Sequence, residues 1–402
     1  MKDAAADLRL AAGLCLAIGT YDVLYVASMM AGGPLLGLSV NALFPDFLVF
    51  HGAVRGWLEG QPIYDAATFT AYQNELYADR LDVPETFRPF LYPPLWLLIV
   101  LPFGALAVGK AYGLFMALTA GLATAVEGPG RWGRWAAVLT CPAAVWVVLA
   151  GQNTFLSLAL LYGGLRLLDT RPILAGVLLG ALAYKPQVWL LVPVALIAAA
   201  QWRALLALAV TVVLFALASL ALFGPELWRS FLAATREAGS PAMADTMFAH
   251  VYTQMTSVAA AGRIAGLPPL PAAILQIAVS LAATVAVWLA FHRRASSVAR
   301  TALLAAAISL VSPYSLNYDL LLVMPAAAAL FARTVATGFW PGERLIYLAL
   351  WLVPTVGIVA NRAGLPVMPV VVLLFGAVAF MRLQARDCIP ARRPPPSAAS
   401  ST

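Results

Sequence analysis

The feature that most constrains this chain is its series of long apolar runs, which are too many to be buried in the core of a soluble protein. The first run covers about residues 10–30. Eleven more lie near 111–127, 135–150, 154–168, 172–184, 188–200, 204–223, 271–291, 300–312, 319–332, 345–360 and 366–381. Only 11% of the 402 residues are charged, whereas a soluble domain averages about 25%. We therefore predict an all-α polytopic membrane protein.

A thirteenth apolar run, "YPPLWLLIVLPFGALAVG" at 92–109, decides on which side the later loops lie. Pro93, Pro94 and Pro102 each remove a backbone donor, and a proline inside a helix kinks or ends it. We therefore interpret this run as re-entrant or interfacial. The prediction is about twelve transmembrane helices with both termini in the cytoplasm, and interfacial helices in the first outer loop.

The distribution of basic residues supports this topology. The segments assigned to the cytoplasm hold 16 of the 25 basic residues and 6 of the 18 acids, as the positive-inside rule expects. The same rule explains the net charge of +7 without nucleic acid as a partner. We expect one transmembrane domain over 1–382, with outer loops at 31–110 and 224–270. The Pro/Ser-rich tail at 383–402 is expected to be a disordered cytoplasmic segment.

Four polar clusters interrupt the apolar pattern, and the topology places all of them on the outer face. Polar groups at membrane depth are costly, so such groups are candidates for function. The candidate residues are Asp46, Arg88, Tyr92, Gln152, Asn153, Lys185, Gln187, Tyr314, Asn317, Tyr318 and Asp319. His250, in the second outer loop, is a further candidate. Their common side predicts one site at the outer membrane boundary.

The residue types fit a lipid-linked phosphosugar as ligand. Asp46 is a candidate base for an acceptor hydroxyl. Lys185 is a cation of the kind that binds phosphate. The amides and tyrosines are neutral hydrogen-bonding groups suited to sugar hydroxyls. No pair of acids has the spacing of a metal site, and we expect no metal and no cofactor.

Each candidate also has a purely structural interpretation. Asp46 could cap a segment at 47–58 that lies in the interface, with Phe47, Phe50, Val54 and Leu58 in lipid. Asp22, within the first apolar run, is a rival base.

The remaining candidates have structural alternatives of the same kind. Lys185 could extend its ammonium to the interface, and Gln152 and Asn153 could cap the helix that follows. Arg88 and Tyr92 could anchor the interface, Asp319 could cap or pair near Lys185, and a lone His250 is usually structural or exposed.

The order and spacing of these motifs resemble glycosyltransferase family 87 over about residues 40–335. The motifs are Asp46-Phe47 with Gly60 and Tyr64, Tyr92-Pro93-Pro94, Gly151-Gln152-Asn153, Lys185-Pro186-Gln187, and Ser312-Pro313 with Tyr318-Asp319. The family contains α-1,2-mannosyltransferases that use polyprenyl-phosphate mannose. The resemblance implies a GT-C fold, an outward-facing site and Asp46 as the catalytic base. Some members carry His where this chain has Asn317-Tyr318, so contacts to the donor phosphate do not carry over there.

The expected function is transfer of a hexose, with mannose as the first expectation, from a polyprenyl phosphate to a lipid or glycan hydroxyl. The expected mechanism is a single displacement with inversion. The implied partners are membrane lipids, the lipid-linked sugar donor and a glycolipid or glycan acceptor, and the implied location is the plasma membrane, the inner membrane of a bacterium. A secondary transporter and an envelope-polymer ligase or flippase remain alternatives.

Overall fold

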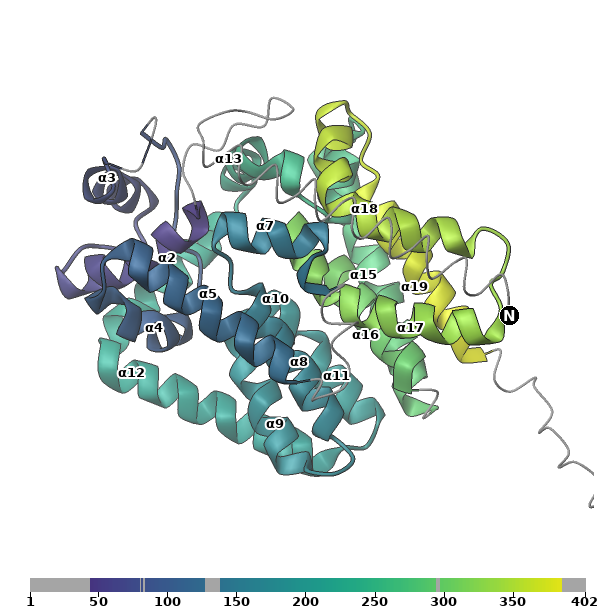
Figure 1. The fold of residues 1–402 in the computed structure, drawn as a ribbon. Helices are drawn as coiled ribbons and strands as arrows, with labels where there is room; N and C mark the ends of the chain where they lie inside the picture. The colour runs from purple at the N-terminus through teal and green to yellow at the C-terminus, as the bar shows by residue number, and fades with distance from the viewer. Residues whose placement is uncertain (1–43, 80, 82–83, 127–137, 294–296, 385–402) are drawn as a thin grey trace, which may run out of the picture.

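The computed structural model describes residues 44–79, 81, 84–126, 138–293 and 297–384. Within these residues the regular structure is helical, apart from one isolated antiparallel bridge between Met255 and Leu316, which confirms the all-α prediction (Figure 1). The first apolar run, Asp22 and the tail from residue 385 lie outside the described residues.

The helices of the N-terminal half bring the first three polar clusters together. They are α2 (Pro45–Leu58), α3 (Ala66–Leu76), α4 (Pro94–Val100), η1 (Leu101–Ala105), α5 (Val108–Ala125), α7 (Pro142–Ala150), α8 (Thr154–Leu167), α9 (Pro172–Ala181), η2 (Leu182–Tyr184), α10 (Pro186–Trp189) and α11 (Leu191–Ala198). Helix α2 packs on α3, α4, η1, α5 and α7.

The C-terminal half supplies the fourth cluster. Its elements are α12 (Trp202–Ala238), α13 (Pro241–Val251), η3 (Tyr252–Gln254), α14 (Val258–Ile264), α15 (Pro269–His292), α16 (Ser297–Val311), η4 (Asn317–Leu322), α17 (Met324–Thr337), α18 (Glu343–Arg362) and α19 (Met368–Gln384). The short η4 packs against α7 and α8, which joins the two halves at the polar residues.

Three described helices are long and apolar enough to cross a bilayer, namely α12, α15 and α18. Six shorter apolar segments of 10–17 residues accompany them, among them Pro94–Ala105. The 92–109 run therefore folds as a short helix, too short for a straight span of about 20 residues. The chain has the helices of a membrane protein, while the count of twelve spans stays a prediction.

Helix α12 is broken where the sequence analysis ended its apolar run. Gly224 has φ 80° and ψ 166°, which is not helical, and Pro225 follows it. Proline cannot donate to the preceding turn, so a second helical piece starts there. The first piece carries many exposed apolar side chains, including Leu206, Leu214 and Leu217, as expected of a surface in contact with lipid.

Helix α2 differs from the interfacial helix that we predicted. Phe47 and Phe50 are 1% exposed and Val54 is fully buried, whereas Leu58 at the end of the helix is exposed. Phe50 lies edge-on to the ring of Trp96, with centroids 4.9 Å apart. The expectation that this face meets lipid was wrong, because α4, η1, α5 and α7 already cover it with apolar side chains.

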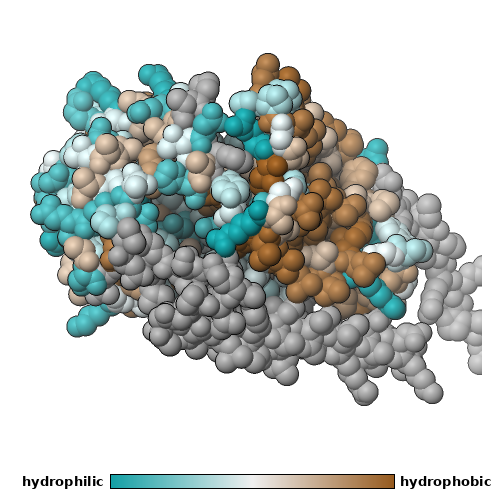
Figure 2. Space-filling model, turned by 90° about the horizontal axis from the view of Figure 1, so that it is seen from above, coloured by the Kyte–Doolittle hydropathy of each residue, from teal (hydrophilic) through white to brown (hydrophobic). Residues whose placement is uncertain are grey.

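On one face of the molecule, polar and apolar side chains gather on different sides (Figure 2). Seen from above, hydrophilic side chains gather at the end where α3 lies, and hydrophobic side chains gather on the side of α18 (Figure 2). Among the exposed apolar residues of the α18 side are Leu345, Val356 and Val359. This separation is typical of a protein that is partly embedded in a membrane.

Candidate active site

The site begins where the end of α7 meets the start of α2. Gly151 ends α7 with φ 72°, a left-handed conformation that favours glycine. A Cβ at this position would lie 2.6 Å from Cβ of Phe47 and 2.9 Å from Cβ of Phe44. The Phe44 amide donates to the Leu149 carbonyl at 2.9 Å. This close approach places Gln152 beside Asp46.

Gln152 is the centre of the hydrogen-bond network. Its Nε2 donates to Oδ2 of Asp46 at 2.8 Å and to the Tyr318 hydroxyl at 3.0 Å. Its Oε1 accepts from the Tyr92 hydroxyl at 3.3 Å and from the Asn153 amide at 3.1 Å. Four of the residues singled out from the sequence therefore meet at one amide group.

Lys185 lies at a break between two helices, next to this network. The residue before a proline is pushed out of the α region, and Lys185, which precedes Pro186, has φ −122° and ψ 79°. Its Nζ donates to Oδ1 of Asp319 at 2.5 Å and to Oδ1 of Asn153 at 3.2 Å. The side chain is 1% exposed, so Lys185 does not extend to the interface as the snorkelling alternative required.

Asp46 is partly exposed at the edge of this buried network. Burial raises the pKa of its carboxyl, while the Gln152 hydrogen bond, the charges of Lys185 and Arg88 and a hydrogen bond from Tyr318 act in the opposite direction. Desolvation disfavours a carboxylate, and donors and cations favour it. A carboxyl poised between these influences is suited to accept a proton.

The structure does not support the two capping alternatives. Asp46 is the second residue of α2, whose N-cap is Phe44, and its side chain bonds Gln152 instead of a helix amide. Asn153 occupies the N-cap position of α8 but makes no side-chain cap. Its Oδ1 accepts from Lys185, and its buried Nδ2 has no hydrogen-bond partner within the described residues.

Two further predicted residues lie close to the network without joining its hydrogen bonds. Asn317 is buried, and its Nδ2 donates to the Pro354 carbonyl at 3.1 Å while its Oδ1 has no partner in the described part of the chain. Arg88 is buried and donates from Nη2 to Glu85 at 2.7 Å. Its Nη1 has no partner among the described residues.

Three predicted residues make no hydrogen bond to Gln152, Asp46, Lys185 or Asp319 among the described residues. His250 is exposed on α13 and shares a hydrogen bond with Thr86. Tyr314 is exposed, and its hydroxyl reaches only the Ala238 carbonyl at 3.5 Å. Gln187 lies on α10, two residues beyond Lys185, and is partly exposed.

Three hydroxyl residues close to Lys185 and Asp319 were not predicted from the sequence. Thr154 donates to Oδ1 of Asp319 at 3.1 Å. The hydroxyls of Ser157 and Tyr184 are 2.8 Å apart, and Tyr184 directly precedes Lys185. All three are polar residues within apolar runs of the sequence. Burying a polar side chain at membrane depth costs free energy, and this cost was the signal that could have identified them as functional candidates.

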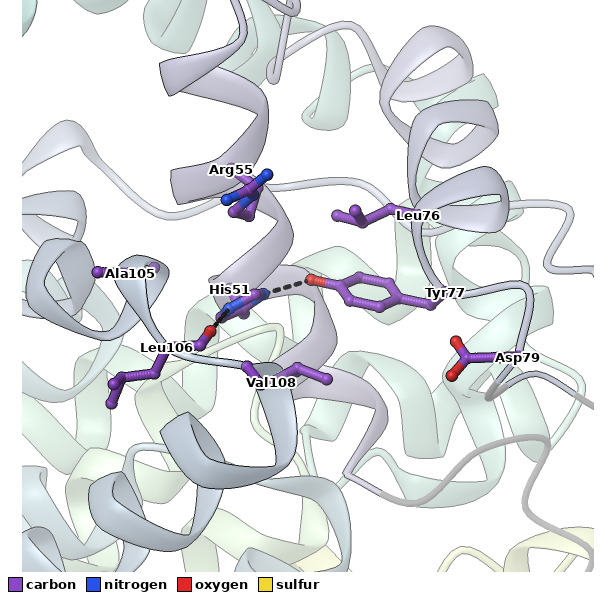
Figure 3. Close-up of a pocket in the computed structure, with 10 residues that line it drawn as sticks. His51, Arg55, Leu76, Tyr77, Asp79, Ala105, Leu106 and Val108 are labelled. Atoms are coloured by element: carbon purple, nitrogen blue, oxygen red, sulfur yellow. Dashed lines mark hydrogen bonds between the residues drawn. The ribbon is translucent and has the colours of Figure 1, made fainter.

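The cavity in Figure 3 is separate from this network. It has a volume of about 290 Å³ and lies between α2, the region after α3 and η1, with His51 and Tyr77 facing each other. His51 Nδ1 is 2.8 Å from the Tyr77 hydroxyl, and Nε2 donates to the Leu106 carbonyl at 2.9 Å. Both ring nitrogens are therefore used in holding η1 and α3 to α2.

No group of three or more His, Cys, Asp or Glu side chains that could hold a metal occurs among the described residues. The chemistry available at the network is thus that of one partly exposed carboxylate, a buried ion pair, amides and tyrosines.

Comparison with known protein families gives a match. The family model for glycosyltransferase family 87 matches residues 90–313, more than half of the chain. The matched range includes Tyr92, Gln152, Asn153 and Lys185, and it excludes Asp46 and Asp319. No curated protein and no solved structure matches the chain.

Proposed function

Because this chain belongs to glycosyltransferase family 87, we propose that it transfers a hexose from a polyprenyl-phosphate donor to a hydroxyl of a lipid or glycan acceptor. Mannose is the first candidate for the sugar. The transfer takes place at the outer face of the membrane, in a GT-C fold, and inverts the anomeric centre.

The observation that carries this proposal is the contact between Asp46 and Gln152. Asp46 lies outside the range that matches the family, whereas Gln152 lies inside it. The 2.8 Å hydrogen bond between them connects the partly exposed carboxylate to the motif Gly151-Gln152-Asn153, which lies in the matched range, and, through Tyr318, to η4. A base in group transfer needs such a fixed position within reach of its substrate.

The proposed step is a single displacement. Asp46 takes the proton of the acceptor hydroxyl as the acceptor oxygen forms a bond to the anomeric carbon. The bond between that carbon and the phosphate oxygen breaks, and its electron pair leaves with the polyprenyl phosphate. No cofactor takes part, and the protonated carboxyl returns its proton to solvent after product release.

The charge of the leaving phosphate needs donors that are not already occupied. Lys185 is paired with Asp319, so its positive charge is largely balanced. Nη1 of Arg88 and Nδ2 of Asn153 are buried donors without a hydrogen-bond partner in the described ranges, and such donors are costly unless a ligand satisfies them. We assign the donor phosphate and an adjacent sugar hydroxyl to these two groups, with Lys185 contributing through its field.

The family favours this enzyme over the two other functions considered from sequence. A secondary transporter places its binding groups on broken helices near the middle of the bilayer. Here the polar groups meet at helix ends, and the family is one of glycosyltransferases.

The decisive experiment is a donor screen with purified protein in lipid nanodiscs. Polyprenyl-phosphate mannose, glucose, galactose and arabinose are supplied one at a time with a bacterial lipid extract as acceptor. Mass spectrometry measures the glycosylated lipid, and NMR of the product gives its anomeric configuration. We expect turnover with one hexose donor and an inverted product. No turnover with any of the four donors, or a retained configuration, would contradict the proposal.

Asp46→Asn tests the assigned base in the same assay. A general base contributes about 10²–10⁴-fold to rate, so we expect a loss of at least about 100-fold in kcat. Asp65→Asn is the matched control, since Asp65 caps α3 through Thr68 and is exposed, and asparagine caps equally well. Normal turnover by Asp46→Asn would remove Asp46 from this role.

A further inference from the structure

The orientation of the Gln152 side chain is determined by its neighbours. The backbone amide of Asn153 can only donate, and it lies 3.1 Å from Oε1 of Gln152. The oxygen of the side-chain amide must therefore face Asn153 and Tyr92, and the nitrogen must face Asp46 and Tyr318. Both hydrogens of Nε2 are used, one toward Oδ2 of Asp46 and one toward the Tyr318 oxygen.

The backbone holds Gln152 in this place independently of its side chain. Its amide donates to the Val147 carbonyl at 2.9 Å, which closes the end of α7 after the left-handed Gly151. Gly151 is packed directly on Phe47, the neighbour of Asp46. The distance between Gln152 and Asp46 is thus set by packing of α7 on α2, and Gln152 is 4% exposed.

Tyr318 adds a second donor to the same carboxylate. Its oxygen accepts from Gln152, which leaves its own hydrogen for the bond to Asp46. Tyr318 is thus connected to Asp46 through their shared neighbour Gln152.

The other charged groups around Asp46 come from separate elements. Arg88 lies in the segment before α4, Lys185 lies between η2 and α10, and Asp319 lies in η4 behind Lys185. Tyr92 faces the carboxylate from the same segment as Arg88. The two cations favour the ionised carboxylate, and Asp319 offsets one of them. Burial has the largest influence on the pKa of Asp46 and raises it, and the Gln152 hydrogen bond is the largest of the influences that lower it.

We propose that Gln152 is a positioning residue that, together with the Tyr318 hydroxyl, orients Asp46 and keeps its carboxylate ionised for proton abstraction from the acceptor. This inference rests on the proposed function of Asp46 as the base. It assigns to Gln152 a role in setting the pH range of the reaction, which a purely structural glutamine would not have.

Gln152→Ala and Tyr318→Phe test the proposal through the pH dependence of kcat. A donor to a carboxylate lowers its pKa, so loss of either donor raises the pKa of Asp46. The base is then ionised only at higher pH. We expect the acidic limb of the profile to move up in both variants, further in Gln152→Ala than in Tyr318→Phe. A shift of about one pH unit lowers kcat by up to about tenfold at a pH on that limb, and the KM for the acceptor should change by less than about threefold.

Gln152→Glu sharpens the test because it keeps the size of the side chain. An ionised glutamate cannot donate and repels the neighbouring carboxylate, so we expect a larger upward shift of the limb than in Gln152→Ala. Gln201→Ala is the matched control. Gln201 is partly exposed at the start of α12, where its side chain makes no cap, and the profile should stay unchanged.

Infrared titration gives the pKa of the Asp46 carboxyl without any turnover. The signal of this carboxyl is the difference between the spectrum of each protein and the spectrum of the same protein with Asp46→Asn. An inactive Asp46→Asn variant with no pKa shift in Gln152→Ala and Tyr318→Phe overturns the positioning role alone. An active Asp46→Asn variant overturns the proposed base. Should Gln152→Ala fail to fold, the nearly isosteric Tyr318→Phe decides the question, and an unshifted limb in it overturns the proposal.

Discussion

The ammonium nitrogen of Lys185 lies 2.5 Å from a carboxylate oxygen of Asp319, and both side chains are shut off from solvent. The two residues are 134 positions apart in the chain, and their pairing joins the η2–α10 break to η4. Asn153 and Thr154 add one hydrogen bond each, to Lys185 and to Asp319 respectively. This pair therefore holds the η2–α10 break, the start of α8 and η4 together.

Removing one partner of this pair is expected to destabilise the protein strongly. Asp319→Asn leaves the Lys185 ammonium buried without a counter-charge, which costs about 3–5 kcal/mol in comparable pairs. The double variant Lys185→Met/Asp319→Leu removes both charges and should recover most of that loss. The measurement is the thermal midpoint of purified protein in one detergent.

The comparison with a surface pair gives the control. Arg229 and Glu226 also form an ion pair, but their side chains are 72% and 78% exposed. Arg229→Ala should cost less than about 1 kcal/mol. An Asp319→Asn variant as stable as Arg229→Ala would show that the buried pair does not hold the two segments together.

Gly151→Ala is expected to disturb both stability and activity. The position has φ 72°, and an added Cβ would lie 2.6 Å from Phe47, so α7 and α2 must separate. Asp46 then loses its fixed distance to Gln152, and we expect kcat to fall by about 100-fold or more. Circular dichroism melting and the transfer assay measure the two effects.

Gly113 provides a matched glycine on α5. Among the described residues, a Cβ there meets nothing within 4 Å, and alanine is favoured over glycine inside a helix by about 0.5–1 kcal/mol. Gly113→Ala should therefore be neutral or slightly stabilising with unchanged kcat. Equal losses in the two alanine variants would contradict the close approach of α7 and α2.

The side of the membrane on which the site lies can be tested by cysteine labelling in intact cells. In a variant lacking Cys15, Cys141 and Cys388, single cysteines replace Glu59, Glu226 and Arg171, all of which are exposed. The positive-inside topology puts Glu59 and Glu226 outside and Arg171 inside. A membrane-impermeant maleimide should label the first two and spare the third. If only the Arg171→Cys variant is labelled, the protein has the orientation opposite to the predicted one.

The sequence singled out the polar residues that meet in the network but not how they pack. The cost of polar groups in apolar runs singled out Asp46, Gln152, Lys185 and Tyr318, and the proline after Lys185 indicated a helix break there. The ion pair with Asp319 was one of three open possibilities for that residue, beside a cap and a role in the chemistry of the site, since no rule of spacing relates residues 134 positions apart.

Helix α2 shows where sequence reasoning failed. Phe47, Phe50 and Val54 lie three or four residues apart, a pattern that is typical of an apolar helix face. The pattern identifies the apolar face of the helix. It does not show whether lipid or protein covers that face, because both are apolar. Only the packing of α4, η1, α5 and α7 on α2 decides that this face is inside the protein.

His51 connects α2 to Tyr77, after α3, and to the Leu106 carbonyl at the end of η1. Burial lowers the pKa of its imidazole from the ordinary value of 6.5. The neutral ring is therefore favoured in the folded state, and the unfolded chain binds a proton first as pH falls. Stability is expected to be constant above about pH 7 and to decrease from about pH 6.5 downward, until the folded protein also takes up the proton.

His51→Gln should be less stable at pH 7.5 and show a flatter pH dependence, whereas His250→Gln, at an exposed position, should keep the wild-type slope. Thermal midpoints between pH 5 and pH 8 provide the measurement, and identical slopes in wild type and His51→Gln would exclude His51 as the source.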